Sequence, residues 1–323
     1  MNNLLISVVI PTFQRPDLLQ RCLTALGSQT LPTDQFEVVV VDDGNDADTA
    51  ALVRNLARQG ALQLSYLGQS QRRGPAAARN RGWRAARSPI IAFTDDDCIP
   101  QPDWLRAALK RFDAGASVVT GRVEMPLPNR PTAHDRTTAL LETAEFVTAN
   151  CFCRRTALEH VGGFDEAFDI AWREDSALQF AFLRAGIPID ACPKAVLVHP
   201  LRPARWYAPL RDERKNRYDA LLYKRYPNLF RARIPHYPAL VTAYYGVVAS
   251  ALMTLGGAVA GNKSVVRAGG VGWLLLTTGL LAYRQANQPI GELPKNGLVT
   301  IVSPFLSVYW RLYGAIKHRV WYL

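Results

Sequence analysis

The sequence predicts an α/β domain built on a mostly parallel sheet, followed by a pair of apolar helices. The first observation is that short apolar segments alternate with segments of helical periodicity between residues 5 and 94. The second is that three apolar segments end in polar clusters, at Pro11-Thr12, Asp42-Asp43 and Asp95-Asp96-Asp97. The third is a change of composition near residue 237, after which 24 residues carry no charge. A chain of 323 residues has room for both parts.

The N-terminal half alternates strands and helices. Four apolar segments are predicted strands: Leu5–Ile10, Phe36–Val41, Leu62–Leu67 and Pro89–Thr94. Three segments with apolar side chains at helical spacing are predicted helices: Asp17–Leu26, Thr49–Arg58 and Gly74–Ala86. Strands joined through helices run parallel, so we expect the polar clusters to meet at one edge of the sheet, where such folds bind ligands.

The most informative cluster is Asp95-Asp96-Asp97, which follows the apolar strand Ile90–Phe93. Three adjacent carboxylates repel one another, and a bound cation offsets that repulsion. The alternative interpretation is a solvated turn that caps a helix starting near Asp103. The position at a ligand-binding edge favours a cation site.

Net charge is +11, and much of it is local, because residues 201–234 contain ten Lys or Arg and three Asp or Glu. An apolar stretch follows directly and no nucleic-acid recognition motif is present, so we expect an anionic membrane surface as partner and no nucleic acid. The five scattered cysteines predict reduced thiols packed in or near the core. No basic segment or cleavage site precedes the first strand, so no signal peptide is expected.

The apolar part predicts a transmembrane hairpin. Tyr237–Ala260 is long enough to cross a bilayer, Gly261–Ser264 is a polar loop, and Val265–Tyr283 is a second apolar segment. A buried pair of soluble helices is the alternative. Six glycines are expected to let the helices pack closely: Gly256, Gly257, Gly261, Gly269, Gly270 and Gly272. The basic segment before the first span places the N-terminal domain on the cytoplasmic side of the cytoplasmic membrane.

The final segment, Leu298–Leu323, predicts an amphipathic helix lying in the membrane interface, with a third span as the alternative. It carries basic residues and five aromatic residues of the kind found at interfaces: Tyr309, Trp310, Tyr313, Trp321 and Tyr322. The expected domains are therefore residues 1–235, a helix hairpin over 236–286 and an interfacial segment over 287–323.

An ordered set of motifs over residues 4 to 200 resembles family 2 glycosyltransferases with the GT-A fold, which is Rossmann-like. The matching segments are Ser7–Arg15, Val38–Gly44, Gly74–Gly82, Asp95–Asp97, Val161–Glu166 and Trp172–Asp175. The resemblance implies a nucleotide-sugar donor, with a UDP-sugar the donor we expect. The donor-binding residues it implies are Pro11, Thr12, Phe13, Arg15, Asp43, Arg79, Asp95 and Asp96.

The resemblance also implies a metal site and a catalytic base. Asp97 is the expected direct ligand of Mg²⁺ or Mn²⁺, and Asp95 and His199 are further candidate ligands. Asp175 is the expected general base, or Glu174 if the register is off by one. Trp172 and Arg173 are assigned to the acceptor side.

The predicted activity is inverting, metal-dependent transfer of a sugar to a hydroxyl group of a lipid-linked or cell-envelope glycan. One alternative is a polyprenyl-phosphate sugar synthase, whose acceptor is a lipid phosphate. Another is a catalytically dead, membrane-anchored protein that binds sugar nucleotides. A dinucleotide-dependent oxidoreductase is disfavoured, because no G-x-G-x-x-G motif follows the first strand.

Overall fold

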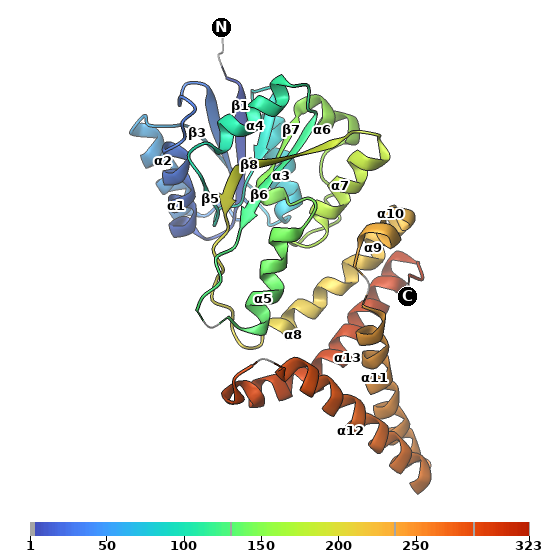
Figure 1. Cartoon of the computed structure of the whole chain (residues 1–323). Coiled ribbons are helices and arrows are strands. Elements are labelled where there is room, and N and C mark those ends of the chain that lie inside the picture. The colour runs from blue at the N-terminus through green and yellow to red at the C-terminus, as the bar shows by residue number, and fades with distance from the viewer. Residues whose placement is uncertain (1–3, 130, 236, 287, 323) are drawn as a thin grey trace. The chain divides into compact units, whose positions relative to one another are not determined.

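The computed structural model describes residues 4–129, 131–235, 237–286 and 288–322 (Figure 1). The chain divides into two compact units. The first consists of Met1–Asn129 with Thr138–Leu201 and contains the sheet. The second consists of Arg130–Thr137 with Arg202–Leu323 and contains the apolar helices. The unit that contains the sheet thus ends at Leu201, before the domain boundary expected at residue 235.

Eight strands form one sheet in the described part of the first unit, in the order β3-β2-β1-β4-β7-β6-β8-β5. Their bounds are β1 Ile6–Thr12, β2 Phe36–Asp42, β3 Gln63–Gly68, β4 Ile90–Phe93, β5 Ile99–Pro100, β6 Val118–Glu124, β7 Cys151–Arg154 and β8 Ile189–Val198. β1 pairs in parallel with β2 and β4, β2 with β3, and β6 with β8, which confirms the mostly parallel sheet. β7 is antiparallel to β4 and β6, and β5 to β8.

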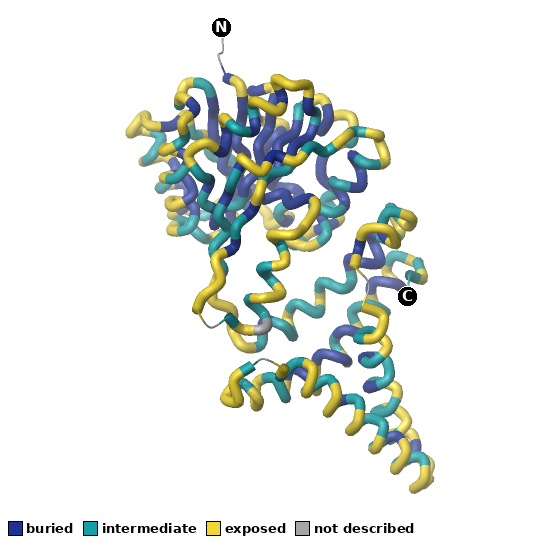
Figure 2. Tube along the Cα trace, viewed as in Figure 1, coloured by how far each residue is buried: buried dark blue, intermediate teal, exposed yellow. Residues whose placement is uncertain are grey.

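Alternate residues of the strands enter two separate hydrophobic cores, because successive side chains point to opposite faces of a sheet. Val8 and Val38 belong to one core, whereas Val9 and Val39 belong to the other. Most residues of the central strands are correspondingly buried (Figure 2). Near-continuous apolar strands are typical of a sheet covered on both faces.

The helices of the first unit cover the two faces. Side chains of α1 (Pro16–Gly27), α2 (Ala47–Arg58) and α4 (Trp104–Asp113) enter the first core. Those of α3 (Pro75–Ala85), α6 (Arg155–Val161) and α7 (Glu174–Arg184) enter the second. The short helices η1 Leu140–Thr143 and η2 Thr148–Asn150 also belong to this unit, whereas most of α5 (Ala133–Ala139) falls in the segment assigned to the second unit. The three predicted helices match α1, α2 and α3 to within two residues at each end.

Helix α3 lies very close to the sheet at Gly82. A Cβ atom at this position would come within 2.3 Å of Cγ1 of Val9 on β1, so no larger residue fits without a shift. This close packing fixes the helix that carries Arg79 and Asn80 against the central strand of the site.

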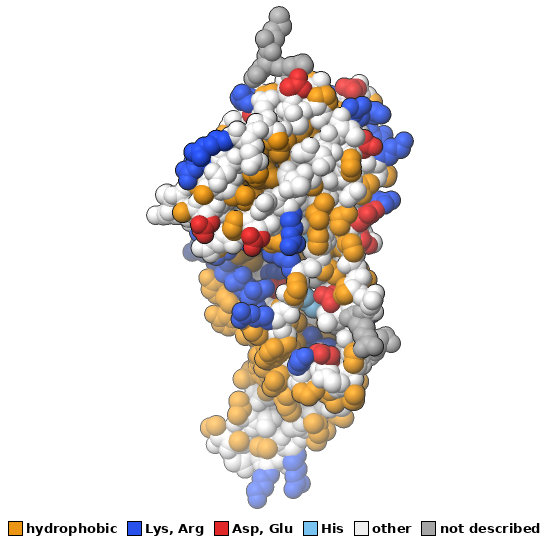
Figure 3. Space-filling view, turned by 90° about the vertical axis from the view of Figure 1, so that its left-hand side faces the viewer, with side chains coloured by type: hydrophobic (Ala, Val, Ile, Leu, Met, Phe, Trp, Pro, Cys, Tyr) orange, Lys and Arg blue, Asp and Glu red, His pale blue; other side chains and the backbone are white. Residues whose placement is uncertain are grey.

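The second unit is helical. Its elements are α8 Ala208–Asp212, η3 Glu213–Asn216, α9 Arg217–Arg225, α10 Pro227–Arg233, α11 Pro238–Val259, α12 Lys263–Gln285, η4 Ile290–Glu292 and α13 Leu293–His318. Only α11 and α12, among the described helices, are long and apolar enough to cross a membrane. Figure 3 shows apolar side chains over much of the surface of this unit. Exposed members of this apolar surface include Leu252, Leu255, Leu274, Leu275 and Phe305.

Three of the six hairpin glycines lie where α11 and α12 touch. A Cβ atom on Gly257, Gly269 or Gly272 would come within 3.0 Å of the facing helix. Gly256, Gly261 and Gly270 have no such neighbour within 4 Å, so they are not needed for close packing. Spacing along the sequence did not distinguish the inner face of each helix from the outer one.

Helix α13 begins at Leu293, earlier than the predicted start, and continues through Pro304. The aromatic residues of α13 and of the segment that follows it divide into two groups. Tyr309 is 56% exposed and Trp321 is 76% exposed, as expected for interfacial side chains. Tyr322 instead packs its ring against Tyr223 and Phe230 inside the second unit.

Candidate active site

The carboxyl ends of β1, β2, β4 and β8 bring the predicted donor and metal residues to one edge of the sheet. Thr12 and Asp42 are the last residues of β1 and β2, and His199 follows the end of β8. β8 shares this direction because β7 reverses the chain between β4 and the parallel pair β6–β8. Pro11 lies buried inside β1, opposite Val41 of β2, and so shapes the backbone that leads into the site.

Asp96 joins the loop after β1 to the acid cluster. The hydroxyl of Thr12 donates to Oδ2 of Asp96 over 2.7 Å, and Nη2 of Arg15 lies 2.9 Å from its Oδ1. Burial, with smaller contributions from Asp97 and Asp95, raises the pKa of Asp96 to about 6 against the opposing effect of Arg15 and Thr12. Asp96 therefore serves first to hold the loop after β1 in place.

Asp97 and His199 lie close enough to bind the same metal ion. Nε2 of His199 lies 3.8 Å from Oδ1 of Asp97, and the Sγ atom of Cys98 lies 3.9 Å from the same oxygen. All three side chains place a potential ligand atom within 4.8 Å of the other two. Metal–ligand bonds are about 2.0–2.3 Å long, so one divalent ion could contact both Asp97 and His199. The sequence predicted Asp97 and His199, and it missed Cys98, whose only signal was its position directly after the acids.

A carboxylate and an imidazole are a suitable donor set for a divalent cation. Nε2 of His199 is the ring nitrogen that faces Asp97, and Nδ1 is buried with no hydrogen-bond partner among the described residues. Arg15 also approaches the acids, with Nη1 3.8 Å from Oδ2 of Asp97. The guanidinium of Arg15 therefore supplies positive charge to the cluster.

Arg79 connects the acid cluster to the predicted catalytic residues. Its Nη2 lies 2.6 Å from Oδ1 of Asp95, and its Nη1 lies 3.3 Å from Oε1 of Glu174. Burial opposes ionisation of Asp95, but Arg79 and, to a smaller extent, His199 and Arg15 outweigh it and lower the pKa of Asp95. Both terminal nitrogens of Arg79 thus contact protein carboxylates. The predicted contact of Arg79 with a diphosphate stays a prediction.

Glu174 and Asp175 open helix α7 after a strained residue. Arg173 precedes the helix with a φ of 71°, a left-handed conformation that is rare for a residue with a side chain. Burial raises the pKa of Glu174, and the adjacent Asp175 raises it further. Burial also raises the pKa of Asp175, although the N–H of Ser176 donates to its Oδ1 over 2.6 Å. Both carboxyl groups thus hold a proton more tightly than an ordinary acid.

The two predicted acceptor residues lie beside this helix start. The guanidinium carbon of Arg173 is 4.9 Å from the centre of the Trp172 ring, a cation–π arrangement. Trp172 is 37% exposed, so part of the residue is accessible to solvent.

Asp43 is buried and holds the loop over residues 69–74. Its Oδ1 accepts hydrogen bonds from Nε2 of Gln69 and the N–H of Arg73, and its Oδ2 accepts one from the N–H of Gly74. The predicted contact of Asp43 with a nucleotide base stays a prediction. The sequence did not reveal this loop-holding role, because its partners lie about 30 residues away and two of them are backbone groups.

Phe13 covers the start of the loop after β2. A Cβ atom on Gly44 would lie 2.9 Å from the Phe13 ring. The guanidinium carbon of Arg72 lies 4.4 Å from the centre of the same ring. The loop after β1 and the loop over residues 69–74 are therefore joined through an aromatic–cation contact.

Asn80, next to Arg79 on α3, holds the Val161–Glu166 segment. Its side chain donates to the carbonyl of Phe164 over 2.9 Å and to Oε1 of Glu166 over 2.8 Å. Its Oδ1 accepts the N–H of Phe164 and Nε1–H of Trp83, each over 2.9 Å. Two adjacent residues of one helix thus fix both the acid cluster and the glycine-rich segment.

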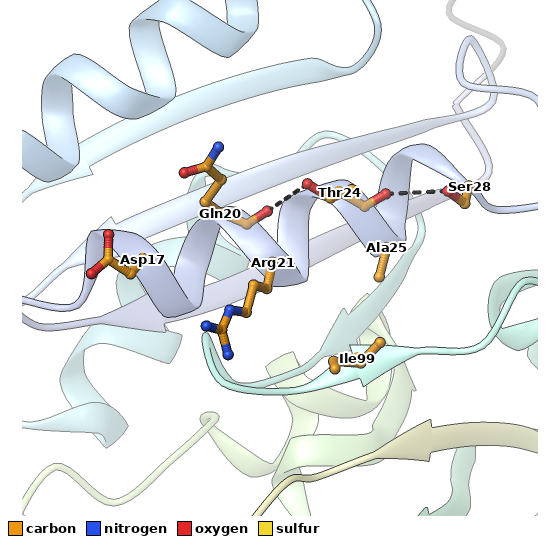
Figure 4. A pocket seen from close by; sticks show the side chains of 7 residues that line it. All are labelled: Asp17, Gln20, Arg21, Thr24, Ala25, Ser28 and Ile99. Atoms are coloured by element: carbon orange, nitrogen blue, oxygen red, sulfur yellow. Dashed lines mark hydrogen bonds between the residues drawn. The ribbon is translucent and has the colours of Figure 1, made fainter. Parts of the chain in front are cut away.

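A surface hollow beside α1 lies outside this cluster (Figure 4). It is lined by Asp17, Gln20, Arg21, Thr24, Ala25, Ser28 and Ile99. The hydroxyls of Thr24 and Ser28 are already bonded to carbonyls of their own helix. None of the predicted site residues lines this hollow, and we assign it no function.

Comparisons with known proteins agree with this arrangement. A sequence model of the family described as glycosyl transferase family 2 matches residues 7–169. Glycosyltransferase AglE of Haloferax volcanii is 30% identical over 212 residues, which are 61% of this chain and 67% of that protein. The family match includes Asp95–Asp97 and stops before Glu174 and His199.

A second relative and one solved structure extend the comparison. The GalNAc(5)-diNAcBac-PP-undecaprenol beta-1,3-glucosyltransferase of Campylobacter jejuni is 32% identical over 116 residues, which are 36% of this chain and 37% of that protein. The chain thus spans two thirds of the first relative's length and little more than a third of the second's. The mannosyltransferase PcManGT of Pyrobaculum calidifontis, solved with GDP-Man and Mn²⁺, has a TM-score of 0.57 at 22% identity over 95% of this chain and 87% of that one. The likeness to PcManGT shows the fold alone.

Proposed function

The chain belongs to glycosyl transferase family 2, and from that premise we propose that it moves a sugar from a nucleotide-sugar donor to a hydroxyl group of a lipid-linked or cell-envelope glycan, with inversion at the anomeric carbon. The observation that carries this proposal is the contact of Arg79 with both Asp95 and Glu174, which unites the acid cluster with the helix bearing Asp175. The lipid-linked substrate in the name of the Campylobacter relative supports the acceptor class.

On the donor side, the end of β1 (Pro11 and Thr12) and the loop after it (Phe13 and Arg15) face the nucleotide, and Asp43 stands beside them. Asp97 and His199, with Asp95 nearby, would hold Mg²⁺ or Mn²⁺. A divalent cation bound there would neutralise the charge that the nucleoside diphosphate gains as it leaves. The Mn²⁺ and GDP-Man bound by the structural neighbour support a cation and a nucleotide sugar of this general kind.

On the acceptor side, Asp175 takes the proton of the attacking hydroxyl group, and Glu174 is the alternative base. A carboxyl group with a raised pKa suits this task, because its proton affinity lies closer to the operating pH. Trp172 offers a ring on which a sugar can stack, and Arg173 lies against it. In-line attack from the side opposite the leaving diphosphate inverts the configuration.

We further place the enzyme at the inner face of the cytoplasmic membrane, with residues 1–235 catalytic, 236–286 a hairpin anchor and 287–323 interfacial. The lengths and apolar character of α11 and α12 support the anchor. The basic segment before α11 supports the orientation and brings the protein to anionic headgroups. Protection of the N-terminal unit from external protease in intact cells would support this orientation, and cleavage there would contradict it.

The direct test uses the full chain in detergent or nanodiscs. UDP-, GDP- and dTDP-sugars are screened with Mn²⁺ for a rise in unfolding temperature, and the donor that binds is then offered with a lipid-linked acceptor. Release of nucleoside diphosphate only when acceptor is present supports the proposal. Absence of donor binding across the series contradicts it. Transfer of the sugar to a polyprenyl phosphate that carries no glycan would instead identify a polyprenyl-phosphate sugar synthase.

A further inference from the structure

Arg79 is the most deeply buried cation of the candidate site. Only 3% of its side chain is exposed, compared with 33% for Arg15. Its two terminal nitrogens reach carboxylates that are 16 and 95 residues away along the chain, Asp95 and Glu174. Its Nε is buried without a hydrogen-bond partner in the described residues. The Phe164 ring lies 5.6 Å from the guanidinium carbon.

A buried guanidinium between two carboxylates is held by strong and directional contacts. The planar fork of arginine has donors on separate nitrogens and can serve two acceptors at once, which a lysine ammonium on a flexible stem does less well. Removing such a cation leaves the buried Glu174 and the half-buried Asp95 without their shared partner, which is unfavourable for both carboxylates. The geometry of the first turn of α7 therefore depends on Arg79.

A direct contact with a donor diphosphate is harder to reconcile with these facts. A diphosphate would have to share the guanidinium with Asp95 and Glu174, and only 3% of the Arg79 side chain is exposed to it. Arg15 also pairs with a buried carboxylate, that of Asp96, but a third of its side chain is exposed, so an anionic ligand can reach it more readily than it can reach Arg79.

We infer that Arg79 is a positioning residue that links the donor-side carboxylate Asp95 to the base-bearing helix α7 through Glu174, and that it does not bind the donor diphosphate. This inference rests on the proposed transferase function. Arg79 sets where Glu174 lies, and Glu174 begins the helical turn that presents Asp175. Loss of Arg79 should accordingly slow turnover while donor binding remains.

The test compares Arg79→Gln, Arg79→Lys, Glu174→Gln and the double variant Arg79→Gln/Glu174→Gln in the full chain. Arg84→Gln is the matched control, because Arg84 lies on the same helix, is 53% exposed and pairs more loosely with Glu166 at 3.7 Å. Donor Kd is measured by calorimetry, and kcat and the donor KM by nucleotide release.

We expect Arg79→Gln to lower kcat on the order of a hundredfold, while donor Kd and KM change less than about threefold. Arg79→Lys should recover part of kcat, because it restores the charge but not the fork. In the double variant no uncompensated Glu174 charge remains, so kcat should exceed that of Arg79→Gln by about tenfold. Arg84→Gln should behave as wild type.

A rise of donor Kd by more than about tenfold in Arg79→Gln, with kcat kept, would assign Arg79 to the diphosphate and overturn the inference. Independent effects of the two substitutions on kcat would overturn it as well. If wild-type protein with bound donor neither transfers nor hydrolyses it, the proposed function fails and the inference falls with it. An active wild type with independent effects contradicts the inference alone.

Discussion

Nε2 of His199 lies 3.8 Å from Oδ1 of Asp97, although the two residues belong to different strand ends of the sheet. This distance suits two ligands of one ion, because each metal–ligand bond would span about 2.0–2.2 Å. The pair therefore provides the geometric basis for a prediction about metal dependence.

Replacing Asp97 with Asn should abolish transfer and weaken Mn²⁺-dependent donor binding, while the fold survives. The amide keeps the shape of the side chain but removes one of the clustered negative charges, so no loss of folding stability is expected from repulsion. Transfer rates and the Mn²⁺-induced shift of unfolding temperature are the measurements. Full activity of the variant, or of wild type after treatment with EDTA, would contradict the metal site.

Replacing Asp175 with Asn should leave donor binding intact and lower turnover by about a hundredfold or more, the usual scale for loss of a general base. The reason is that an amide cannot accept the proton of the attacking hydroxyl group. Glu174→Gln is the informative comparison in the same assay. If Glu174→Gln is the inactive variant and Asp175→Asn stays active, the base is one residue earlier than predicted.

Turnover should rise with pH above the ordinary carboxylate range. The base acts only when deprotonated, and burial raises the pKa of Asp175 above its usual value. The acid side of the kcat profile should therefore lie at higher pH than an exposed aspartate would give. A profile that is flat down to the ordinary pKa of aspartate, near 3.9, would contradict this assignment.

Folding stability should show the matching effect at Glu174. Burial and Asp175 raise its pKa in the folded state, so its stabilising contribution is complete below the unfolded pKa and is lost as pH rises through the folded one. Glu174→Gln removes this titration and should gain stability relative to wild type as pH increases. Urea unfolding at several pH values measures the difference, and an unchanged difference between acid and alkaline pH would refute it.

Gly74 is placed where only glycine fits. Its φ is +90°, and a Cβ atom there would lie 2.4 Å from the carbonyl oxygen of Asp169. Gly74→Ala should destabilise the fold by about 1–3 kcal/mol or more and weaken donor binding, because the loop held by Asp43 must move. Gly60→Ala is the control, since Gly60 has a φ of +72° with no atom within 4 Å. Equal unfolding temperatures for the two variants would rule out the steric part of this argument.

The parts of the site that follow predicted strands were accessible from the sequence. Asp95–Asp97 and the Thr12 loop could be placed because apolar strands of this type run parallel and end at one edge. The contacts of Arg79 could not, because a sequence does not show which of several carboxylates a buried arginine meets. Cys98 was assigned to packing, because the sequence does not show that His199 lies close to it in the fold. Strands β5, β6 and β7 were missed because they are short or depend on antiparallel partners far along the chain.

The contact between the apolar helices α11 and α12 gives the last prediction. Gly269 on α12 faces α11, where a Cβ atom would lie 2.7 Å from the backbone nitrogen of Thr254, whereas the adjacent Gly270 has no neighbour within 4 Å. Gly269→Leu should separate the two helices and lower the unfolding temperature of the full chain in detergent, because small residues permit close helix packing. Gly270→Leu should leave that temperature within error of wild type and keep the protein in the membrane fraction. Equal losses in the two variants would show that the helices do not pack through this face, and recovery of wild type in the soluble fraction without detergent would refute the anchor itself.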